Sequence, residues 1–231
     1  MSASRLLALD TGSPRVSIAV ALDGTVVAES TLEQARSSAE LLRRIDDCLR
    51  AAGMRPVDLS AIAVLRGPGS FTGLRIGLAT AHGLRAALGT AVAVLPSLRV
   101  LAEHGRERAG EAGRARSWIG AVDALRGEWY MQAFDEEAPA AGRPGALVPH
   151  DVAAIVAADV LAARRPATVC GFGVGAIAAR DGWPADCEAL EAENVASTAA
   201  RLAPTLPELW DAQLLTAPLY LREPAVTLPA R

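Results

Sequence analysis

The chain has 231 residues, of which 51% are hydrophobic, and its formal net charge is only −3. This length is enough for one large α/β domain or for two halves of roughly 110 residues each, and the small charge provides no overall field that would attract nucleic acid or an anionic membrane. All 23 basic residues are arginine, which excludes a Walker-type phosphate lysine, a Schiff-base lysine and a Ser–Lys dyad.

Three features of the chain indicate a cytoplasmic protein. The cysteines are odd in number and widely spaced, without a C-x-x-C pair: Cys48, Cys170 and Cys187. This usage argues against a disulfide framework or a zinc site and indicates a reducing compartment. The N-terminal stretch, residues 1–9, is too short for a signal peptide, and polar residues follow it too soon. No apolar run reaches membrane-spanning length, because Arg75, His82 and Arg85 interrupt the best candidate.

The first elements predict an antiparallel meander of three strands. Leu6–Leu9 is a short apolar run, as in a buried strand, and Val16–Val20 alternates as a half-exposed strand should. Asp23-Gly24 then predicts a tight turn into Val26-Val27.

Helices and strands alternate after this meander. A capping box at Ser37–Glu40 predicts a helix that Gly53 ends, with apolar residues at helical spacing: Leu41, Leu42, Ile45, Leu49 and Ala52. Ala61–Leu65 reads as a buried strand, Thr72–Leu88 as a helix that ends at Gly89, and Ala91–Leu95 as another buried strand, after which Pro96-Ser97 opens a further helix. The first hundred residues therefore predict the order βββαβαβα.

A polar, glycine-rich stretch over 103–116 predicts the boundary between two lobes, 1–107 and 108–231. In the second lobe, Trp118–Val122 and Glu128–Phe134 indicate paired strands. A helical pattern follows over His150–Ala163, and Ala167–Cys170 indicates a short strand. The tail, at about 217–223, predicts a short extended segment that returns to the N-terminal lobe.

Asp10-Thr11-Gly12-Ser13 follows an apolar run, as the aspartic-protease signature does. That chemistry needs two carboxylates that share a proton, and hence two such loops or a symmetric dimer of small chains. No second Asp-Thr-Gly occurs, and the helices that follow do not fit an all-β protease. Two interpretations remain open. The motif is either the first phosphate loop of an actin-like ATPase, with Asp10, Thr11 and Gly12 as weak nucleotide contacts, or a plain turn.

Residues 65–75 are rich in glycine and join a predicted strand to a long helix. They do not complete a P-loop, because Leu74-Arg75 follows Gly73 where Lys-Ser/Thr is required. They also lack a nucleophile elbow, because Pro68 and Thr72 stand where glycines must flank Ser70. What remains is a helix N-terminus, capped by Ser70 or Thr72, with free N–H groups that suit an anion.

Small residues form a stripe on the helix behind this junction. Gly73, Gly77 and Ala81 lie four residues apart on one face. Each glycine costs about 1 kcal/mol of helix propensity relative to alanine, which makes sense if another element lies close against the stripe. The residues alone leave open whether that element belongs to this chain or to a partner protein.

The remaining motifs are weaker. Gly171–Ala176 fits G-x-G-x-x-[GA] formally, but it comes late in the chain and a glycine-rich turn is favoured. Asp123–Glu128 indicates a self-paired loop or, less commonly, a catalytic one. His82, His104 and His150 form no metal-ligand pattern; we expect His82, in the middle of its helix, to be packed or hydrogen-bonded and the other two to face solvent.

Four segments together resemble the TsaB (YeaZ) family. They are Leu7–Thr11, Arg66–Gly77, Val122–Ala124 with Arg126–Glu128, and Pro218–Arg222. The resemblance covers nearly the whole chain. It implies two actin-like (ribonuclease H-like) α/β lobes, each a mixed sheet with flanking helices.

The resemblance also implies a function. It predicts a non-catalytic subunit that works with a TsaD-like catalytic subunit and a TsaE-like ATPase in making threonylcarbamoyladenosine in tRNA. The chain would form a homodimer when TsaD is absent, contact tRNA only indirectly, and hold no metal or cofactor of its own, although a nucleotide could bind at the interface of the complex. Its partner interface would comprise two helices and the junction: Leu41, Leu42, Ile45, Gly67, Pro68, Gly69, Ser70, Phe71, Thr72, Gly73, Leu74, Arg75, Gly77 and Ala81.

This sequence departs from the family in one respect, because Arg36-Ser37-Ser38 stands where members often carry a histidine. Any role of that histidine is not carried over. The alternative function is an enzyme that acts alone, as a glycopeptidase or a nucleotide hydrolase. The absence of an H-x-x-x-H pattern and of lysine favours the partner subunit.

Overall fold

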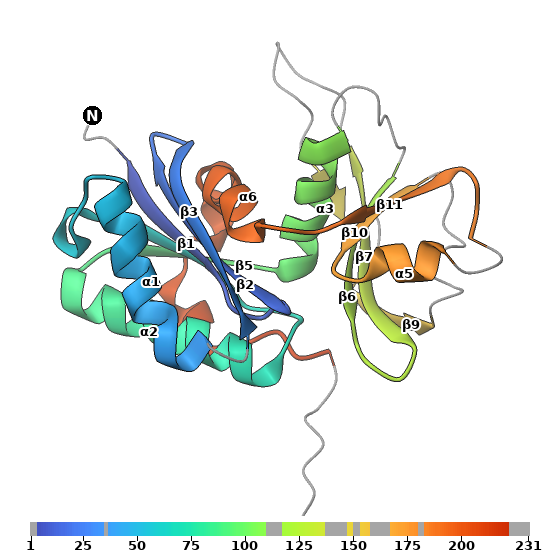
Figure 1. The fold of residues 1–231 in the computed structure, drawn as a ribbon, viewed down its shortest axis with the longest axis horizontal. Coiled ribbons are helices and arrows are strands. Elements are labelled where there is room, and N and C mark those ends of the chain that lie inside the picture. Colours follow the sequence, from blue (N-terminus) through green and yellow to red (C-terminus); the bar gives the residue numbers. More distant parts are fainter. Residues whose placement is uncertain are drawn as a thin grey trace, which may run out of the picture.

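The computed structural model describes residues 4–34, 37–109, 117–136, 147–149, 153–157, 167–179 and 183–221. They form two sheets that lie side by side, each covered by helices (Figure 1). Within these residues, no helix is both long and apolar enough to cross a bilayer.

The first sheet has the order β3-β2-β1-β4-β5. Its strands are β1 (Arg5–Asp10), β2 (Arg15–Leu22), β3 (Thr25–Glu33), β4 (Ala61–Leu65) and β5 (Ala91–Leu95). The first three are antiparallel, whereas β4 pairs parallel to β1 and β5 parallel to β4. With helices α1 (Ser37–Ala51), α2 (Phe71–Leu88) and α3 (Ser97–Ala109), the predicted order βββαβαβα is confirmed.

Both faces of this sheet are buried because strand β1 alternates between two cores. Leu7 and Leu9 pack with α1 and α2 on one face. Leu6 and Ala8 pack on the other face with α6 (Val195–Leu202). Successive side chains of a strand point to opposite faces, so a continuous apolar run is what a strand between two helical layers requires.

The second sheet has the order β11-β10-β6-β7-β8, with β9 also paired to β7. Its strands are β6 (Ser117–Asp123), β7 (Glu128–Glu136), β8 (Leu147–Pro149), β9 (Ala154–Ala157), β10 (Ala167–Gly171) and β11 (Cys187–Glu191). The short helix α5 (Val174–Ala178) precedes β11. The predicted strands at 118–122, 128–134 and 167–170 are confirmed.

One predicted helix is wrong in the part of it that the structure describes. Within His150–Ala163, residues 154–157 form strand β9, which pairs antiparallel with 128–131 of β7. Positions 150–152 and 158–163 lie outside the described residues. A short run of Ala, Ile and Val fits either element by periodicity. The hydrogen-bonding edge of β7 decides for the strand, and that edge is not visible in the local sequence.

In each predicted lobe, 1–107 and 108–231, one helix packs on the sheet of the other lobe. Helix α3 follows the first sheet in sequence but packs on the second (Figure 1). The approach is close, since a Cβ at Gly120 of β6 would lie 1.9 Å from the Leu98 carbonyl oxygen of α3. Conversely, α6 follows the second sheet but packs on β1 and β2 of the first. The two helices meet between the sheets.

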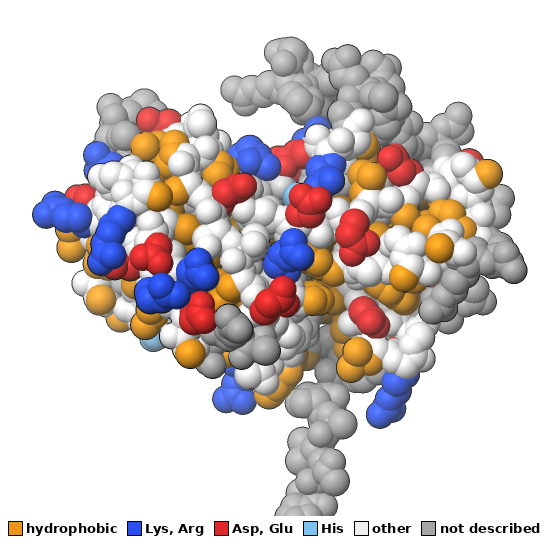
Figure 2. All heavy atoms as spheres, in the orientation of Figure 1, with side chains coloured by type: hydrophobic (Ala, Val, Ile, Leu, Met, Phe, Trp, Pro, Cys, Tyr) orange, Lys and Arg blue, Asp and Glu red, His pale blue; other side chains and the backbone are white. Residues whose placement is uncertain are grey.

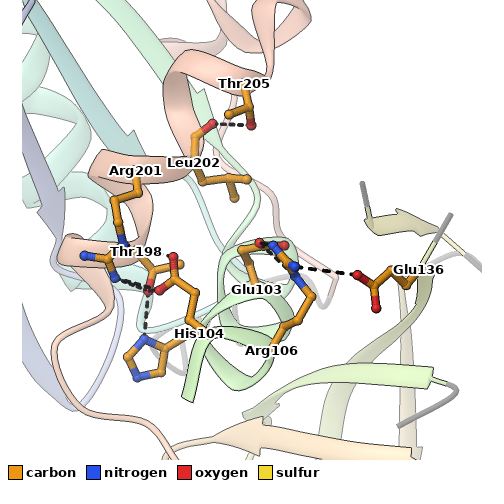
Figure 3. A network of polar contacts seen from close by, with 9 residues as sticks. Glu103, His104, Arg106, Glu136, Thr198, Arg201, Leu202 and Thr205 are labelled. Carbon is orange, nitrogen blue, oxygen red and sulfur yellow. Dashed lines mark hydrogen bonds and ion pairs between the residues drawn. The ribbon is translucent and has the colours of Figure 1, made fainter. Parts of the chain in front are cut away.

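A polar network joins α3 to α6 at this meeting point (Figure 3). Thr198 donates to the Glu107 carboxylate over 2.6 Å, and Arg201 donates to the same carboxylate over 2.9 and 2.6 Å. Because a carboxylate only accepts, the Thr198 proton is used there, so His104 Nδ1, 2.9 Å from the Thr198 oxygen, must be the donor. Burial would raise the pKa of Glu107, but the hydrogen bonds from Arg201 and Thr198 outweigh it and lower that pKa.

His104 therefore differs from its prediction. It is 7% exposed and lies between the lobes, not at the surface, and burial lowers its pKa. A second ion-pair chain runs from Glu103 through Arg106 to Glu136 and ties α3 to the end of β7 (Figure 3). Charged groups on the α3 surface thus connect it to both neighbouring layers.

Candidate functional site between the two sheets

A cleft of about 490 Å³ opens between the two sheets, where three segments singled out by the sequence meet. The first lobe contributes Gly12, Ser13, Pro14, Gln34, Gly69, Ser70, Phe71 and Thr72. The second lobe contributes Val122, Asp123, Ala124, Leu125, Tyr130 and Phe172. The Asp-Thr-Gly-Ser loop, the glycine-rich junction and the β6–β7 turn, which are far apart in the chain, therefore share one site.

Asp10 lies at the end of β1 and is fully buried. Its Oδ1 accepts the N–H groups of Gly12 and Ser13 over 3.0 and 3.3 Å. Burial raises the pKa of Asp10 to about 6, although these hydrogen bonds and one from the Ser13 side chain oppose the shift. In a phosphate loop, such amide N–H groups would be offered to the ligand. Here they are hydrogen-bonded to the Asp10 carboxylate.

Thr11 is also turned away from the cleft. Its side-chain hydroxyl is buried and donates to the Gly73 carbonyl of α2 over 2.8 Å. Of the three predicted nucleotide contacts, only Gly12 lines the cleft. Nucleotide binding by this loop stays a prediction.

The glycine-rich junction holds the start of α2 against this loop. Ser70 is the N-cap, as one of the two predicted alternatives had it: its Oγ accepts the Gly73 N–H over 3.3 Å. The Ser70 N–H donates to the Gly12 carbonyl over 2.8 Å. A Cβ on Gly69 would lie 2.8 Å from that same carbonyl oxygen, so glycine is what allows the two backbones to touch.

The small-residue stripe of α2 packs within the chain. A Cβ on Gly73 would lie 2.0 Å from the Thr11 carbonyl oxygen, and one on Gly77 would lie 2.1 Å from Thr11 Oγ1. Ala81 is fully buried. The expectation that Gly73, Gly77 and Ala81 contact a partner is therefore wrong, because these positions already face the chain's own β1–β2 loop and core.

The other predicted interface residues divide by exposure. Five are buried and cannot contact a partner directly: Leu41, Ile45, Gly67, Pro68 and Leu74. Gly69 and Ser70 are half-buried at the cleft, whereas Thr72 and Arg75 are exposed. Two exposed large apolar side chains remain, Leu42 at 65% and Phe71 at 39%. Contact with a partner stays a prediction, and it now concerns only those residues of the set that are exposed or half-buried.

The turn between β6 and β7 forms the opposite wall. The Asp123 carboxylate accepts the Leu125 N–H over 2.7 Å, and the Ala124 N–H donates to the Glu128 carbonyl over 2.9 Å. Leu125 and Arg126 have φ values of 67° and 59°, which is uncommon for residues other than glycine. The Asp123 carboxylate is hydrogen-bonded within its own turn, as the self-paired interpretation predicts.

Sequence reasoning missed several residues of the cleft. Gln34, Tyr130 and Phe172 line it but were not selected. Phe172 stands inside the Gly171–Ala176 motif, so an aromatic residue between two glycines was the available signal. The amides of that motif are occupied, because the Glu191 carboxylate accepts the N–H groups of Gly173 and Gly175.

The histidines are not brought together. His82 is exposed on α2, so the packed alternative predicted for it is wrong, and His104 lies between α3 and α6. His150 lies outside the described residues. Within the described part of the chain, no three His, Cys, Asp or Glu side chains are grouped as metal ligands would be.

Comparison with known proteins gives consistent matches. Residues 25–142 match the family model described as TsaD, tRNA N6-adenosine threonylcarbamoyltransferase. The tRNA threonylcarbamoyladenosine biosynthesis protein TsaB of Escherichia coli (strain K12) is 36% identical over 135 residues, which cover 58% of this chain and 56% of that protein. TsaB of Bacillus subtilis (strain 168) is 37% identical over 102 residues, or 44% of each chain.

The matched region spans about half the length of these curated relatives. A solved structure extends the likeness to nearly the whole chain. YeaZ from Pseudomonas aeruginosa superposes with a TM-score of 0.72 at 28% identity and covers 94% of this chain and 100% of its own. The two sheets with exchanged helices are therefore an actin-like (ribonuclease H-like) fold.

Two glycines of α2 provide a matched test of the packing against Thr11. Gly77→Ala puts a methyl group where Thr11 Oγ1 lies, and we expect it to lower the free energy of unfolding by about 1–3 kcal/mol. Gly83→Ala meets nothing within 4 Å, so helix propensity alone should raise that free energy by up to about 1 kcal/mol. Urea denaturation measures both; equal effects of the two substitutions would contradict the packing.

Asp10 predicts a pH dependence of stability. Burial raises its pKa from the ordinary value of 3.8 to about 6 in the folded chain, so over this range the folded state binds a proton that the unfolded state releases. The contribution of Asp10 is complete below pH 3.8 and is lost as the pH rises through 6. Between pH 7.5 and 5, the wild type should gain about 1 kcal/mol relative to Asp10→Asn, as measured by urea denaturation at each pH. Parallel pH profiles of the two proteins would refute this assignment.

Proposed function

The chain belongs to the TsaB (YeaZ) family, and on this premise we propose that it is a non-catalytic partner subunit in the synthesis of threonylcarbamoyladenosine in tRNA. In this proposal a TsaD-like subunit transfers the threonylcarbamoyl group to the adenosine beside the anticodon. A TsaE-like ATPase completes the assembly. Curated relatives that match about half their length to this chain are named tRNA threonylcarbamoyladenosine biosynthesis proteins, which supports the pathway.

The state of the carboxylates at the cleft carries the proposal of a non-catalytic subunit. Asp123 is the single charged side chain among the described residues that line the cleft. One of its oxygens accepts the Leu125 N–H, and Asp10 is buried behind the cleft on the amides of its own loop. Proton transfer in a reaction needs a group within hydrogen-bond reach of the substrate. Asp10 does not line the cleft, and Asp123, although exposed there, uses one oxygen to hold its own turn.

The outward side of α1 and α2 supports the proposal of a partner. The two helices lie side by side on one face of the first sheet (Figure 1). Leu42 on α1 and Phe71 at the start of α2 are exposed, whereas the small residues of α2 are turned inward. In the proposed complex, this pair of helices contacts the TsaD-like subunit. When that subunit is absent, the same surface would pair two copies of this chain.

Reconstitution tests the function directly. The purified chain alone should neither transfer threonylcarbamoyl to tRNA nor cleave glycopeptides, and transfer should appear when the TsaD-like and TsaE-like proteins are added. Asp10→Asn should retain at least half of the reconstituted rate, because that carboxyl acts within its own loop. Transfer is measured by mass spectrometry of nucleosides from digested tRNA. Robust turnover by the chain alone that Asp10→Asn abolishes would overturn the proposal in favour of an enzyme.

The proposed docking surface is tested by two matched substitutions. Leu42→Asp places a charge on an apolar contact, so it should weaken association with the TsaD-like subunit at least tenfold. Val57→Asp makes the same change at a residue of similar exposure, 67% against 65%, that belongs to neither helix, and should change the affinity less than twofold. Isothermal titration calorimetry measures both. Equal affinities for the two variants would place the contact elsewhere.

A further inference from the structure

We propose that the groove between α2 and the segment 215–220 binds an acidic, apolar stretch of a partner protein in extended conformation. This inference rests on the proposed function, because the partner meant is the catalytic subunit. It adds a second contact beside the exposed faces of α1 and α2 and states the chemistry of what fills it.

The groove has a volume of about 460 Å³ and two walls. Helix α2 contributes Arg75, Leu78, Ala79 and His82, and the C-terminal segment contributes Leu215, Thr216, Pro218 and Tyr220. Leu78 and Leu215 are only 4% and 5% exposed. They form an apolar floor below a rim that carries polar groups.

The C-terminal wall is held in place. The Leu219 N–H donates to the Arg66 carbonyl over 2.7 Å, so the segment is fixed to the glycine-rich junction. The Tyr220 ring lies 5.1 Å from the Phe71 ring at the start of α2. A groove whose walls are already ordered loses little conformational entropy when it binds a ligand.

Among its described lining residues, the groove has an arginine and a histidine at the rim. The Arg75 guanidinium lies 5.3 Å above the Phe71 ring, and the sequence of α2 contains no Asp or Glu. None of the described residues that line the groove is acidic. On α1, in contrast, Arg43 and Arg44 pair with Glu40, and Arg50 pairs with Asp46, so basic and acidic side chains are interspersed over that helix (Figure 2).

This difference identifies the charge of the occupant. Arg75 is positioned by a ring, not by a carboxylate, so its N–H donors are available to an acid from outside. His82 adds a ring N–H donor at the other end of the groove. Carboxylates at the rim and an apolar side chain on the floor are what complements these walls.

The spacing of the two rim residues is compatible with an extended occupant. Arg75 and His82 are seven residues apart, which is about 10 Å along a helix axis. An extended chain rises about 3.3 Å per residue, so about three residues span the same distance. A segment with an acidic residue near Arg75, and an apolar side chain one or two positions away over Leu78 and Leu215, matches the groove.

A crosslinking experiment identifies the occupant. Ala79, exposed on the groove wall, is replaced by the photo-crosslinking residue p-benzoylphenylalanine in the full chain, which is then irradiated with the TsaD-like subunit. Mass spectrometry should find one partner peptide that contains an apolar residue beside Asp or Glu. A crosslink to a second copy of this chain, or to a peptide without an acid, would overturn the proposal.

A charge reversal measures the contribution of the rim. Arg75→Glu should weaken binding of the TsaD-like subunit at least tenfold and should flatten its dependence on salt concentration. Arg85→Glu reverses an exposed charge on the same helix outside the groove and should change the affinity less than twofold. Circular dichroism checks that both variants are folded.

The outcomes separate this inference from the proposed function. If Leu42→Asp abolishes binding while Arg75→Glu acts no more strongly than Arg85→Glu, the groove is unused and the partner-subunit function stands. If the wild-type chain does not bind the TsaD-like subunit at all, both proposals fail.

Discussion

Contact between the β1–β2 loop and helix α2 is the constraint on which the rest of the structure depends. The Thr11 carbonyl and hydroxyl oxygens lie where side chains at positions 73 and 77 would have to be, and the Gly12 carbonyl lies where one at 69 would be. Three glycines therefore set how closely the helix approaches the sheet. The same approach places Gly12, Ser13, Ser70 and Thr72 together at the wall of the cleft. At these positions glycine lowers the helix propensity but allows the backbones to pack closely.

A second constraint comes from the exchange of helices between the sheets. Because α3 packs on the second sheet and α6 on the first, the two lobes are joined by packed helices and not only by the chain crossings. The network of His104, Glu107, Thr198 and Arg201 holds these helices together by hydrogen bonds that include a charged carboxylate and a guanidinium. The opposite wall of the cleft, which carries Asp123 and Phe172, is positioned through this connection.

Together these constraints separate the inner and outer sides of α2. The glycines on its inner side are in close contact with Thr11. Its outer side presents Phe71, Arg75 and His82 beside a C-terminal segment that is hydrogen-bonded to Arg66. A helix without acidic residues next to one whose arginines are paired within the helix gives the surface a local basic character. The net charge of −3 for the whole chain does not reveal it.

The sequence by itself determined the element order of the first lobe and the end of α2 at Gly89, and it limited the N-cap of α2 to Ser70 or Thr72, because periodicity, capping and glycine signals are local. It also indicated the family, through the motif at Arg66–Gly77. Tertiary structure alone decided that Gly73 and Gly77 face Thr11, that His104 is buried and His82 exposed, and that 154–157 forms a strand. Each of these depends on which surface lies opposite, and a small residue, a histidine or a short apolar run is compatible with more than one neighbour until the chain has folded.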